Sequence, residues 1–463
     1  MATSFDTDGI ATALTGALTD AQVSVGSGDR KEHSKDASSH AGHLPDIVVW
    51  PHSTEDVQAV VRIANAGGIP LTAWGAGTSV EGNPIPAHGG IVMDFREMNR
   101  ILEIHANDFQ VTVEPGVLYK DMNRELGRQG LFFAPDPGAN ASIGGMVANN
   151  AAGIRTVKYG ATRDNVLALE VLLANGEIVQ TGSRSTKQSS GYDLTHLIVG
   201  SEGTLGIVTK ATLRLHPIPE HYSAAIAAFP TVEDAAQTVY EIAASGLDPN
   251  AMEILDTYCI ELINRAESLD WDETPTLIME FSDASTTPLI EKMKTVEDIC
   301  ADNHCTSFSS GVGRNERERL WEMRHGFFEL LVRSHPGKTW LLSDICVPVS
   351  QFPTLVHRAR ELSEEFGTDT IIFGHAGDGN IHTTNFYDPN APTERDAVMK
   401  ANHELQRFAL SLGGTSTGEH GIGLGKLKYM ESEHGASAVQ LMRDVKELFD
   451  PKGILNPGKI LPD

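Results

Sequence analysis

Hydrophobic side chains in residues 55–66 recur every three or four positions, at Val57, Val60, Val61 and Ile63 or Ala64. Two glycines follow directly, so the spacing predicts an amphipathic helix that ends there. Short apolar runs that predict strands lie at 69–74, 89–95, 109–116 and 206–215. Residues 167–179 place an Asn-Gly pair between two apolar runs, which predicts a hairpin. We therefore expect residues 45–218 to form one mixed α+β unit.

Strand-like and helix-like segments alternate in residues 219–430. Strands are expected at 223–229, 276–281 and 340–349, and helices at 231–246, 287–301 and 350–366. So few segments favour a small sheet covered by helices over a wound barrel. Residues 1–44 hold one short amphipathic stretch and a polar run, and we expect a loosely attached N-terminal arm. Residues 431–463 are expected to form a C-terminal segment with one helix.

Composition indicates a globular protein with more than one core. The chain has 463 residues, of which 40% are hydrophobic and 21% charged, and no apolar run is long enough to span a membrane. The net charge of −26 argues against binding to nucleic acid or anionic membranes. Only 15 of the 36 basic residues are lysine. A salt-adapted surface and an ordinary acidic enzyme both fit this balance.

The four cysteines point to a reducing compartment. Their positions form no CxxC pair, so we expect no structural zinc, iron–sulfur cluster or disulfide framework; they are Cys259, Cys300, Cys305 and Cys346. The first residues show neither a secretory signal nor a mitochondrial presequence. The prediction is a cytoplasmic protein, either free or held at the inner face of the membrane through an electron acceptor.

Three glycine-rich segments lie in the first unit, at 74–84, 134–153 and 199–209. In the first, Gly75, Gly77 and Gly82 do not have the G-x-G-x-x-G spacing of a dinucleotide fold, and no long helix is expected after them. Small residues still expose successive backbone N–H groups, which bind anions. One such segment is more often only a turn, but three within one unit predict a large phosphate-bearing cofactor.

Histidines and a glutamate occur in two glycine-rich turns of the remaining chain. His375 and His382 are expected on a strand–loop–strand with a Gly-Asp-Gly turn between them, and Glu419 and His420 lie in another glycine-rich turn. Two imidazoles and one carboxylate suit a borderline divalent cation, although the spacing alone also fits unrelated loop histidines. Because adjacent residues of an extended chain point in opposite directions, we expect Glu419 and His420 to have different roles.

These segments and their order resemble the vanillyl-alcohol-oxidase/PCMH superfamily over nearly the whole chain. The most similar branch is that of D-lactate dehydrogenase (cytochrome), alongside the glycolate oxidase catalytic subunit and D-2-hydroxyglutarate dehydrogenase. The resemblance implies an α+β fold: a PCMH-type FAD-binding domain, then a cap domain with a small antiparallel sheet covered by helices, and a C-terminal segment that returns to the FAD domain. The residues that it assigns to FAD are Gly75, Ala76, Gly77, Thr78, Ser79, Gly82, Pro135, Gly138, Ser142, Gly144, Gly145, Asn150, Gly153, Glu202, Gly203, Ile207, Val208 and Asn456.

The resemblance also implies a reaction. His375, His382 and Glu419 match the family's metal motif, for zinc or manganese, which leaves His420 as the general base. Arg324 matches the arginine that grips the substrate carboxylate. No histidine lies between Trp74 and Pro86, so the FAD is expected to be non-covalent. The function implied is oxidation of a short D-2-hydroxy acid, D-lactate preferred, to the 2-oxo acid.

Electrons then have to leave the chain. The acceptor expected is external: a quinone, a cytochrome, an electron-transfer flavoprotein or an iron–sulfur subunit. Glycolate and D-2-hydroxyglutarate remain alternative substrates, although residues 341–343 lack the lysine that the 2-hydroxyglutarate branch carries there. From other classes, a flavin-free metal hydrolase would use the same histidines, and a flavoprotein subunit could merely relay electrons.

Overall fold

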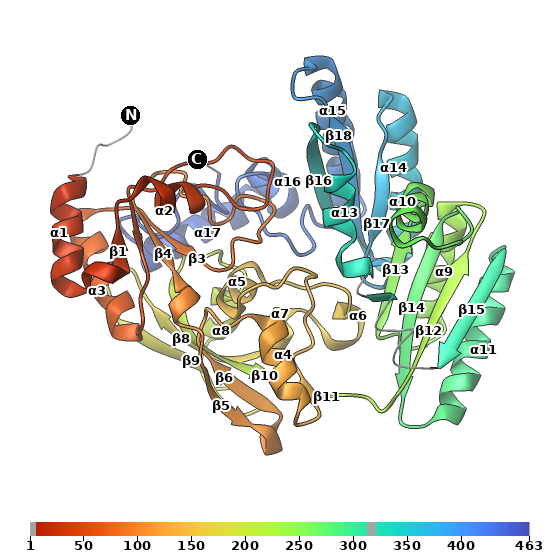
Figure 1. Cartoon of the computed structure of the whole chain (residues 1–463), viewed down its shortest axis with the longest axis horizontal. Helices are drawn as coiled ribbons and strands as arrows, with labels where there is room; N and C mark the ends of the chain where they lie inside the picture. Colours follow the sequence, from red (N-terminus) through yellow and green to blue (C-terminus); the bar gives the residue numbers. More distant parts are fainter. Residues whose placement is uncertain (1–5, 313–319, 322, 463) are drawn as a thin grey trace. The chain divides into compact units, whose positions relative to one another are not determined.

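The computed structural model describes residues 6–312, 320–321 and 323–462, and its chain divides into two compact units (Figure 1). Unit 1 comprises residues 1–152, 160–218 and 419–463, and unit 2 comprises residues 153–159 and 219–418. The chain thus leaves unit 1 twice, once for a short segment and once for a whole unit. The α+β class expected from the sequence is confirmed.

Unit 1 begins with a four-stranded sheet of order β1-β2-β4-β3, in which β2, β4 and β3 are parallel. Its strands are β1 (Val23–Ser24), β2 (Ile47–Val49), β3 (Leu71–Trp74) and β4 (Ile91–Asp94). The helices near it are α1 (Thr7–Ala17), α2 (Ser27–Glu32) and α3 (Thr54–Gly67). Helix α3 is the helix predicted from 55–66: its periodic apolar residues are buried in one core with the sheet, and Gly68 ends it at φ +62°.

The second sheet of unit 1 is antiparallel, with the order β5-β6-β10-β8-β9. Its strands are β5 (Ile101–His105), β6 (Gln110–Val113), β8 (Val166–Leu172), β9 (Ile178–Gly182) and β10 (Ile207–Arg214). Strands β8 and β9 form the predicted hairpin, with Gly176 at φ +82° in its turn. A small ladder joins β7 (Leu131–Phe132) to β11 (His216–Pro217). The remaining helices are α4 (Tyr119–Gly127), α5 (Ile143–Asn149), α7 (Thr162–Asn165), α8 (Leu194–Ile198), α16 (Met430–His434) and α17 (Ala436–Phe449).

Unit 2 is built on a seven-stranded antiparallel sheet of order β15-β12-β14-β13-β17-β18-β16. Its strands are β12 (His221–Ala228), β13 (Ala251–Leu255), β14 (Thr276–Asp283), β15 (Ser307–Val312), β16 (Thr339–Cys346), β17 (Ile371–Gly374) and β18 (Asn380–Tyr387). Its helices are α6 (Thr156–Tyr159), α9 (Val232–Ala244), α10 (Thr257–Glu267), α11 (Thr286–Asp302), α13 (Phe327–Arg333), α14 (Phe352–Phe366) and α15 (Pro392–Ser411). The sheet is larger than expected because β13 and β15 were not predicted.

The two faces of this sheet differ in chemistry. Helices α9, α11, α14 and α15 cover one face, and the strand residues that point to them are apolar, as Met252, Ile254 and Ile381 are. The other face packs on α10 and α13. Because side chains alternate along a strand, Glu253 and His382 point to this second face.

The N-terminal segment is an integral part of unit 1, contrary to the expected loose arm. Strand β1 pairs with β2, and the fully buried His33 lies 2.8 Å from the carboxylate of Asp94. Asp36 accepts a hydrogen bond from the Gly82 amide at 2.9 Å. The polar residues of this run are therefore partners of buried groups instead of a solvated linker.

The other end of unit 2 also differs from expectation, because residues 419–430 belong to unit 1. The carboxylate of Glu202 accepts hydrogen bonds from the amides of Ile422 and Gly423, and Lys426 pairs with Glu81 at 3.2 Å. Glycines bring this stretch close: a Cβ on Gly423 would lie 2.1 Å from the carbonyl oxygen of Glu81. No described helix is both long and apolar enough to cross a membrane.

The pair of His33 and Asp94 predicts a pH-dependent stability. Burial lowers the pKa of His33, but hydrogen bonds to Asp94 and to the Asp29 carbonyl outweigh burial and raise it above its usual value. A raised folded-state pKa stabilises the fold fully below about pH 6.5 and loses this contribution as pH rises through the raised value. His33→Gln, which cannot carry the charge, should lower the melting temperature by several degrees at pH 6 and by less at pH 9.

Thermal melts of both proteins between pH 5.5 and pH 9 measure this gap. His304→Gln is the matched control, since His304 pairs with Asp234 on the surface of unit 2 and is largely exposed. A gap for His33→Gln that stays constant over this range would show that the charge on His33 contributes nothing.

Candidate functional site

The three glycine-rich segments come together around helix α5 in unit 1. A Cβ on Gly75 would lie 2.2 Å from the hydroxyl of Ser142, the residue that caps α5. The side-chain amide of Asn149 donates to the Ser79 hydroxyl at 3.2 Å. The backbone amide of Glu202 donates to the Ala148 carbonyl at 2.8 Å. Residues more than 120 positions apart in sequence thus line one region of the unit.

The first of these segments presents unused donors. Within the described chain, the backbone amides of residues 75–79 donate to no protein acceptor. Gly77 adopts φ +69°, where a Cβ would also lie 2.9 Å from the Trp74 ring, so only glycine suits this turn. Successive amides in such a turn form a concave anion site. The segment therefore fits a pyrophosphate.

Hydrogen bonds from helix α4 hold the second segment. The hydroxyl of Tyr119 donates to Asp136 at 2.6 Å, and the ammonium of Lys120 donates to the Gly138 carbonyl. The backbone amide of Lys120 also donates to the side chain of Asn140 at 3.1 Å. These bonds hold the turn that precedes α5, and with it the N-terminal end of that helix.

The C-terminal segment ties the first and third segments together through Asn456. Its side-chain amide donates to the carbonyls of Asn83 and Glu202, at 3.0 and 2.7 Å. Lys459 donates to the Ile85 carbonyl at 2.7 Å. Burial lowers the pKa of this lysine to about 8, against the opposing effect of Glu202 and Asp36. Asn456 was assigned to the cofactor by resemblance. In the structure its side-chain amide bonds to the loops themselves and holds them together.

In unit 2, His375 and His382 are neighbours. His375 follows the end of β17 and His382 lies on β18, and the turn between them is the predicted strand–loop–strand. The two ring centroids are 5.1 Å apart and the rings are nearly perpendicular, at 87°. Both imidazoles can thus face one small group.

A buried glutamate lies between one of these histidines and the candidate substrate arginine. Nδ1 of His375 is 2.6 Å from Oε1 of Glu253, and Nη2 of Arg324 is 2.6 Å from Oε2. The Arg324 guanidinium also lies over the Phe373 ring, 5.4 Å from its centroid. Glu253 is fully buried. The structure therefore collects His375, His382 and Arg324 on one face of the unit 2 sheet.

A second buried carboxylate, Asp344, organises the strand beside His382. Its oxygens accept hydrogen bonds from the Asn380 side chain at 2.8 Å and from the Thr417 hydroxyl at 2.9 Å. The Gly418 amide donates to the Asp344 carbonyl at 3.3 Å, and a Cβ on Gly418 would lie 2.4 Å from the Asn380 side chain. Gly418, the last residue of unit 2, therefore lies against Asp344 and Asn380. The next residue of the chain is Glu419.

Glu419 and His420 open the last segment of unit 1, and they do not point apart as expected. Nε2 of His420 lies 3.8 Å from a carboxylate oxygen of Glu419. The expectation assumed extended backbone, whereas this stretch bends and Gly421 follows at φ +80°. The His420 carbonyl accepts from Asn83 and Asn149, which joins this turn to the first glycine-rich segment.

Comparison with known proteins decides the family. The model of the FAD linked oxidase C-terminal domain matches residues 218–460, and that of an FAD binding domain matches residues 45–182. The chain belongs to the FAD-linked oxidases. One match lies mainly in unit 1 and the other spans unit 2 and the C-terminal part of unit 1, and the superfamily resemblance found in the sequence is confirmed.

Curated relatives align with this FAD-linked oxidase over most of their length. It is 41% identical to a probable mitochondrial D-lactate dehydrogenase of Danio rerio, over 96% of this chain and 89% of the relative. The D-lactate dehydrogenase [cytochrome] of Arabidopsis thaliana is 39% identical, over 94% and 77%. Glycolate oxidase subunit GlcD of Bacillus subtilis is 37% identical, over 93% and 92%.

Solved structures share the fold at lower identity. A 4-ethylphenol oxidase from Gulosibacter chungangensis matches with a TM-score of 0.79 and 20% identity, over 99% of this chain and 98% of the other. A p-cresol methylhydroxylase matches with a TM-score of 0.78 and 19% identity, over 98% and 96%. These matches confirm the PCMH-type fold of this FAD-linked oxidase.

Most of the remaining predicted cofactor residues fall in unit 1 as well. Ile207 and Val208 lie at the start of β10, and Gly144, Gly145 and Asn150 lie in or directly after α5. Gly153 is the exception, because it begins the short segment 153–159 that groups with unit 2.

Sequence reasoning missed Glu253. It lies in the run AMEIL, where one acidic residue interrupts apolar ones, and the run was not recognised as a strand. A charge inside a short apolar run is the signal that could have found it, because a buried carboxylate needs a cation or donor nearby.

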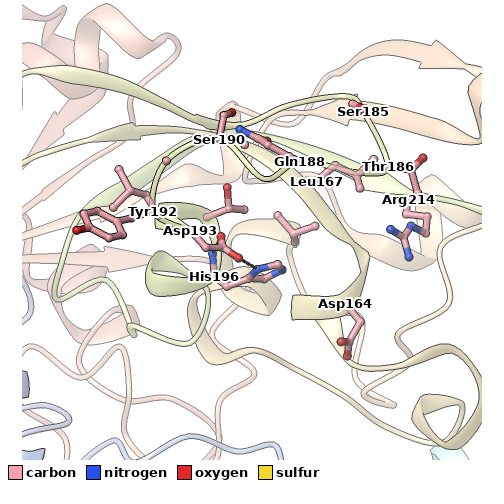
Figure 2. Close-up of a pocket in the computed structure, with 15 residues that line it drawn as sticks. Asp164, Leu167, Ser185, Thr186, Gln188, Ser190, Tyr192, Asp193, His196 and Arg214 are labelled. Atoms are coloured by element: carbon pink, nitrogen blue, oxygen red, sulfur yellow. Dashed lines mark hydrogen bonds and ion pairs between the residues drawn. The ribbon is translucent and has the colours of Figure 1, made fainter.

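A pocket of about 310 Å³ lies elsewhere in unit 1, between β8, the 185–194 loop and α8 (Figure 2). Nδ1 of His196 and the Asp193 carboxylate are hydrogen-bonded at 2.5 Å in its wall, and Arg214 lies across from them. None of the predicted cofactor, metal or catalytic residues lines it. It is therefore separate from the candidate site.

Proposed function

We propose that this FAD-linked oxidase oxidises a short D-2-hydroxy acid, D-lactate first among them, to the 2-oxo acid. The observation that carries the proposal is the gathering of His375, His382 and Arg324 on one sheet face in a chain whose relatives include D-lactate dehydrogenases. The match to an FAD binding domain leaves the flavin-free hydrolase without support.

FAD would be held without a covalent bond by the segments around α5. The unused amides of residues 75–79 would bind its pyrophosphate, and the glycines at 144 and 145 allow close approach of its other parts. FAD supplies a two-electron acceptor when bound. No histidine is present in the first segment to attach it.

Acid precipitation tests this attachment. Trichloroacetic acid should release all of the yellow chromophore into the supernatant, because only hydrogen bonds and packing would hold it. The absorbance of supernatant and redissolved pellet near 450 nm is the measurement. Yellow colour that stays with the pellet after washing would show a covalent flavin.

Arg324 would bind the substrate carboxylate with its planar guanidinium. Opposite His382 and Thr384 on β18, strand β16 carries Asp344 and Leu342, and the basic residue that a second carboxylate would need is not among positions 341–343. This favours a monocarboxylate such as D-lactate or glycolate over 2-hydroxyglutarate.

A divalent cation, zinc or manganese, would be bound by His375, His382 and Glu419. Two histidines and a carboxylate form a suitable donor set, and the buried side-chain oxygen of Asn380, on the same strand as His382, has no partner among the described residues. Such a cation acts as a Lewis acid toward a hydroxyl. His420, next to Glu419, would take the hydroxyl proton of the substrate as general base.

Reduced flavin would pass its electrons to an acceptor outside this chain. Relatives named as cytochrome-dependent favour a cytochrome, and a quinone, an electron-transfer flavoprotein or an iron–sulfur subunit would serve the same chemistry. The cytoplasmic location remains a prediction based on the four cysteines.

Anaerobic mixing with hydroxy acids tests the reaction. D-lactate should bleach the flavin absorbance, glycolate less efficiently, and L-lactate hardly at all, because Arg324 and the base would present only one face of C2. Stopped-flow absorbance near 450 nm gives the rates. A flavin that no 2-hydroxy acid reduces would instead indicate a subunit that only relays electrons.

Substitutions separate the metal from the base. His375→Ala and Glu419→Ala should lose the metal and most turnover but keep FAD, since the proposed FAD segments do not include them. His420→Ala should keep metal and FAD but slow flavin reduction by about 10²-fold or more. Metal analysis, flavin content and stopped-flow rates are the readouts. A His420→Ala variant with the wild-type rate would refute the base assignment.

A further inference from the structure

We infer that Glu253 is a positioning residue that fixes both the metal-ligating nitrogen of His375 and the guanidinium of Arg324. This inference rests on the proposed function and assigns to it a residue that belongs to neither the metal ligands nor the substrate contacts. Its carboxylate is fully buried and lies between the two side chains, 2.6 Å from each.

The bond to His375 determines which ring nitrogen is available. A carboxylate only accepts hydrogen bonds, so Nδ1 of His375 carries the proton and Nε2 is the nitrogen that ligates. Carboxylate partners of this kind fix the tautomer and ring orientation of metal-binding histidines and make the ligating nitrogen more basic.

The other carboxylate oxygen pairs with Arg324, which the Phe373 ring supports from one side. Because both groups are buried and oppositely charged, this ion pair keeps the guanidinium beside the carboxylate. One carboxylate thereby couples the placement of the proposed metal to that of the proposed substrate carboxylate.

Only a carboxylate can meet both requirements. Glutamine has one accepting oxygen and one donating NH₂, so in Glu253→Gln either the His375 proton or the Arg324 cation faces a donor. Glu253→Asp keeps the charge but is one methylene shorter, so it cannot reach both partners.

The matched control is Glu280→Gln. Glu280 lies on the neighbouring strand β14, on the same face of the sheet, and is as deeply buried as Glu253. Its carboxylate accepts from Trp321 at 2.5 Å and from Asn250 at 3.1 Å. Glu280→Gln therefore measures the effect of neutralising a buried carboxylate while Glu253 keeps its bonds to His375 and Arg324.

The test uses the FAD-loaded protein stripped of metal with a chelator. Calorimetric titration with Mn²⁺ should show an affinity about 10- to 100-fold weaker in Glu253→Gln than in wild type, and close to wild type in Glu280→Gln. After metal is restored, the D-lactate concentration that half-saturates flavin reduction should rise roughly tenfold or more in Glu253→Gln but stay close to wild type in Glu280→Gln. Glu253→Asp should change both quantities in the same direction, and serves if Glu253→Gln does not fold.

Wild-type Mn²⁺ affinity and half-saturation in both folded Glu253 variants would overturn the inference. A loss of equal size in Glu280→Gln would also overturn it, because burial of charge would then explain the effect. Failure of the proposed function looks different: the wild-type flavin itself would not be reduced by any 2-hydroxy acid.

Discussion

A buried charge needs a partner, and in unit 2 this requirement determines which polar side chains lie together. In the seven-stranded sheet of unit 2, alternation sends apolar side chains to one face and several carboxylates to the other. There Glu253 meets a histidine and an arginine, and Asp344 meets the Asn380 and Thr417 side chains. Leaving either carboxylate unpaired would cost several kcal/mol, so the partners are constrained to these places.

The same constraint places an aromatic ring and a packed core beside the candidate catalytic side chains. The aromatic ring of Phe373 lies next to both Arg324 and His382, with centroid distances of 5.4 and 5.5 Å. The apolar face behind the sheet, packed on four helices, supplies the rigid support. The candidate catalytic residues therefore lie on one face of an antiparallel sheet whose other face forms an apolar core with helices.

In unit 1 the main structural requirement is to hold three glycine-rich turns in one arrangement. Turns with exposed amides have little packing of their own, and the structure stabilises them with side chains from distant segments: Asp36, Asn149 and Asn456. The N-terminal segment and the C-terminal segment both take part, so the ends of the chain contribute to the cofactor domain.

The sequence by itself determined the local elements and the chemistry of the motifs. Helix α3, the β8–β9 hairpin and the strand–turn–strand around His375 and His382 follow from periodicity and from turn residues, because these signals lie within a few positions of one another. The motifs also indicated the family, which the comparisons confirm. The distant residues that pair with these motifs could not be predicted from such local signals.

Only the tertiary structure decided which distant residues meet. Glu253 is 122 positions from His375, and its strand was not predicted because five residues around one glutamate show no clear period. In the sequence His33 and Asp36 belong to a polar run, yet they are buried against Asp94 and Gly82, which are 61 and 46 positions further along. Burial depends on which surfaces pack together. The partner of a buried polar residue is therefore fixed by tertiary packing, which brings distant residues within hydrogen-bonding distance.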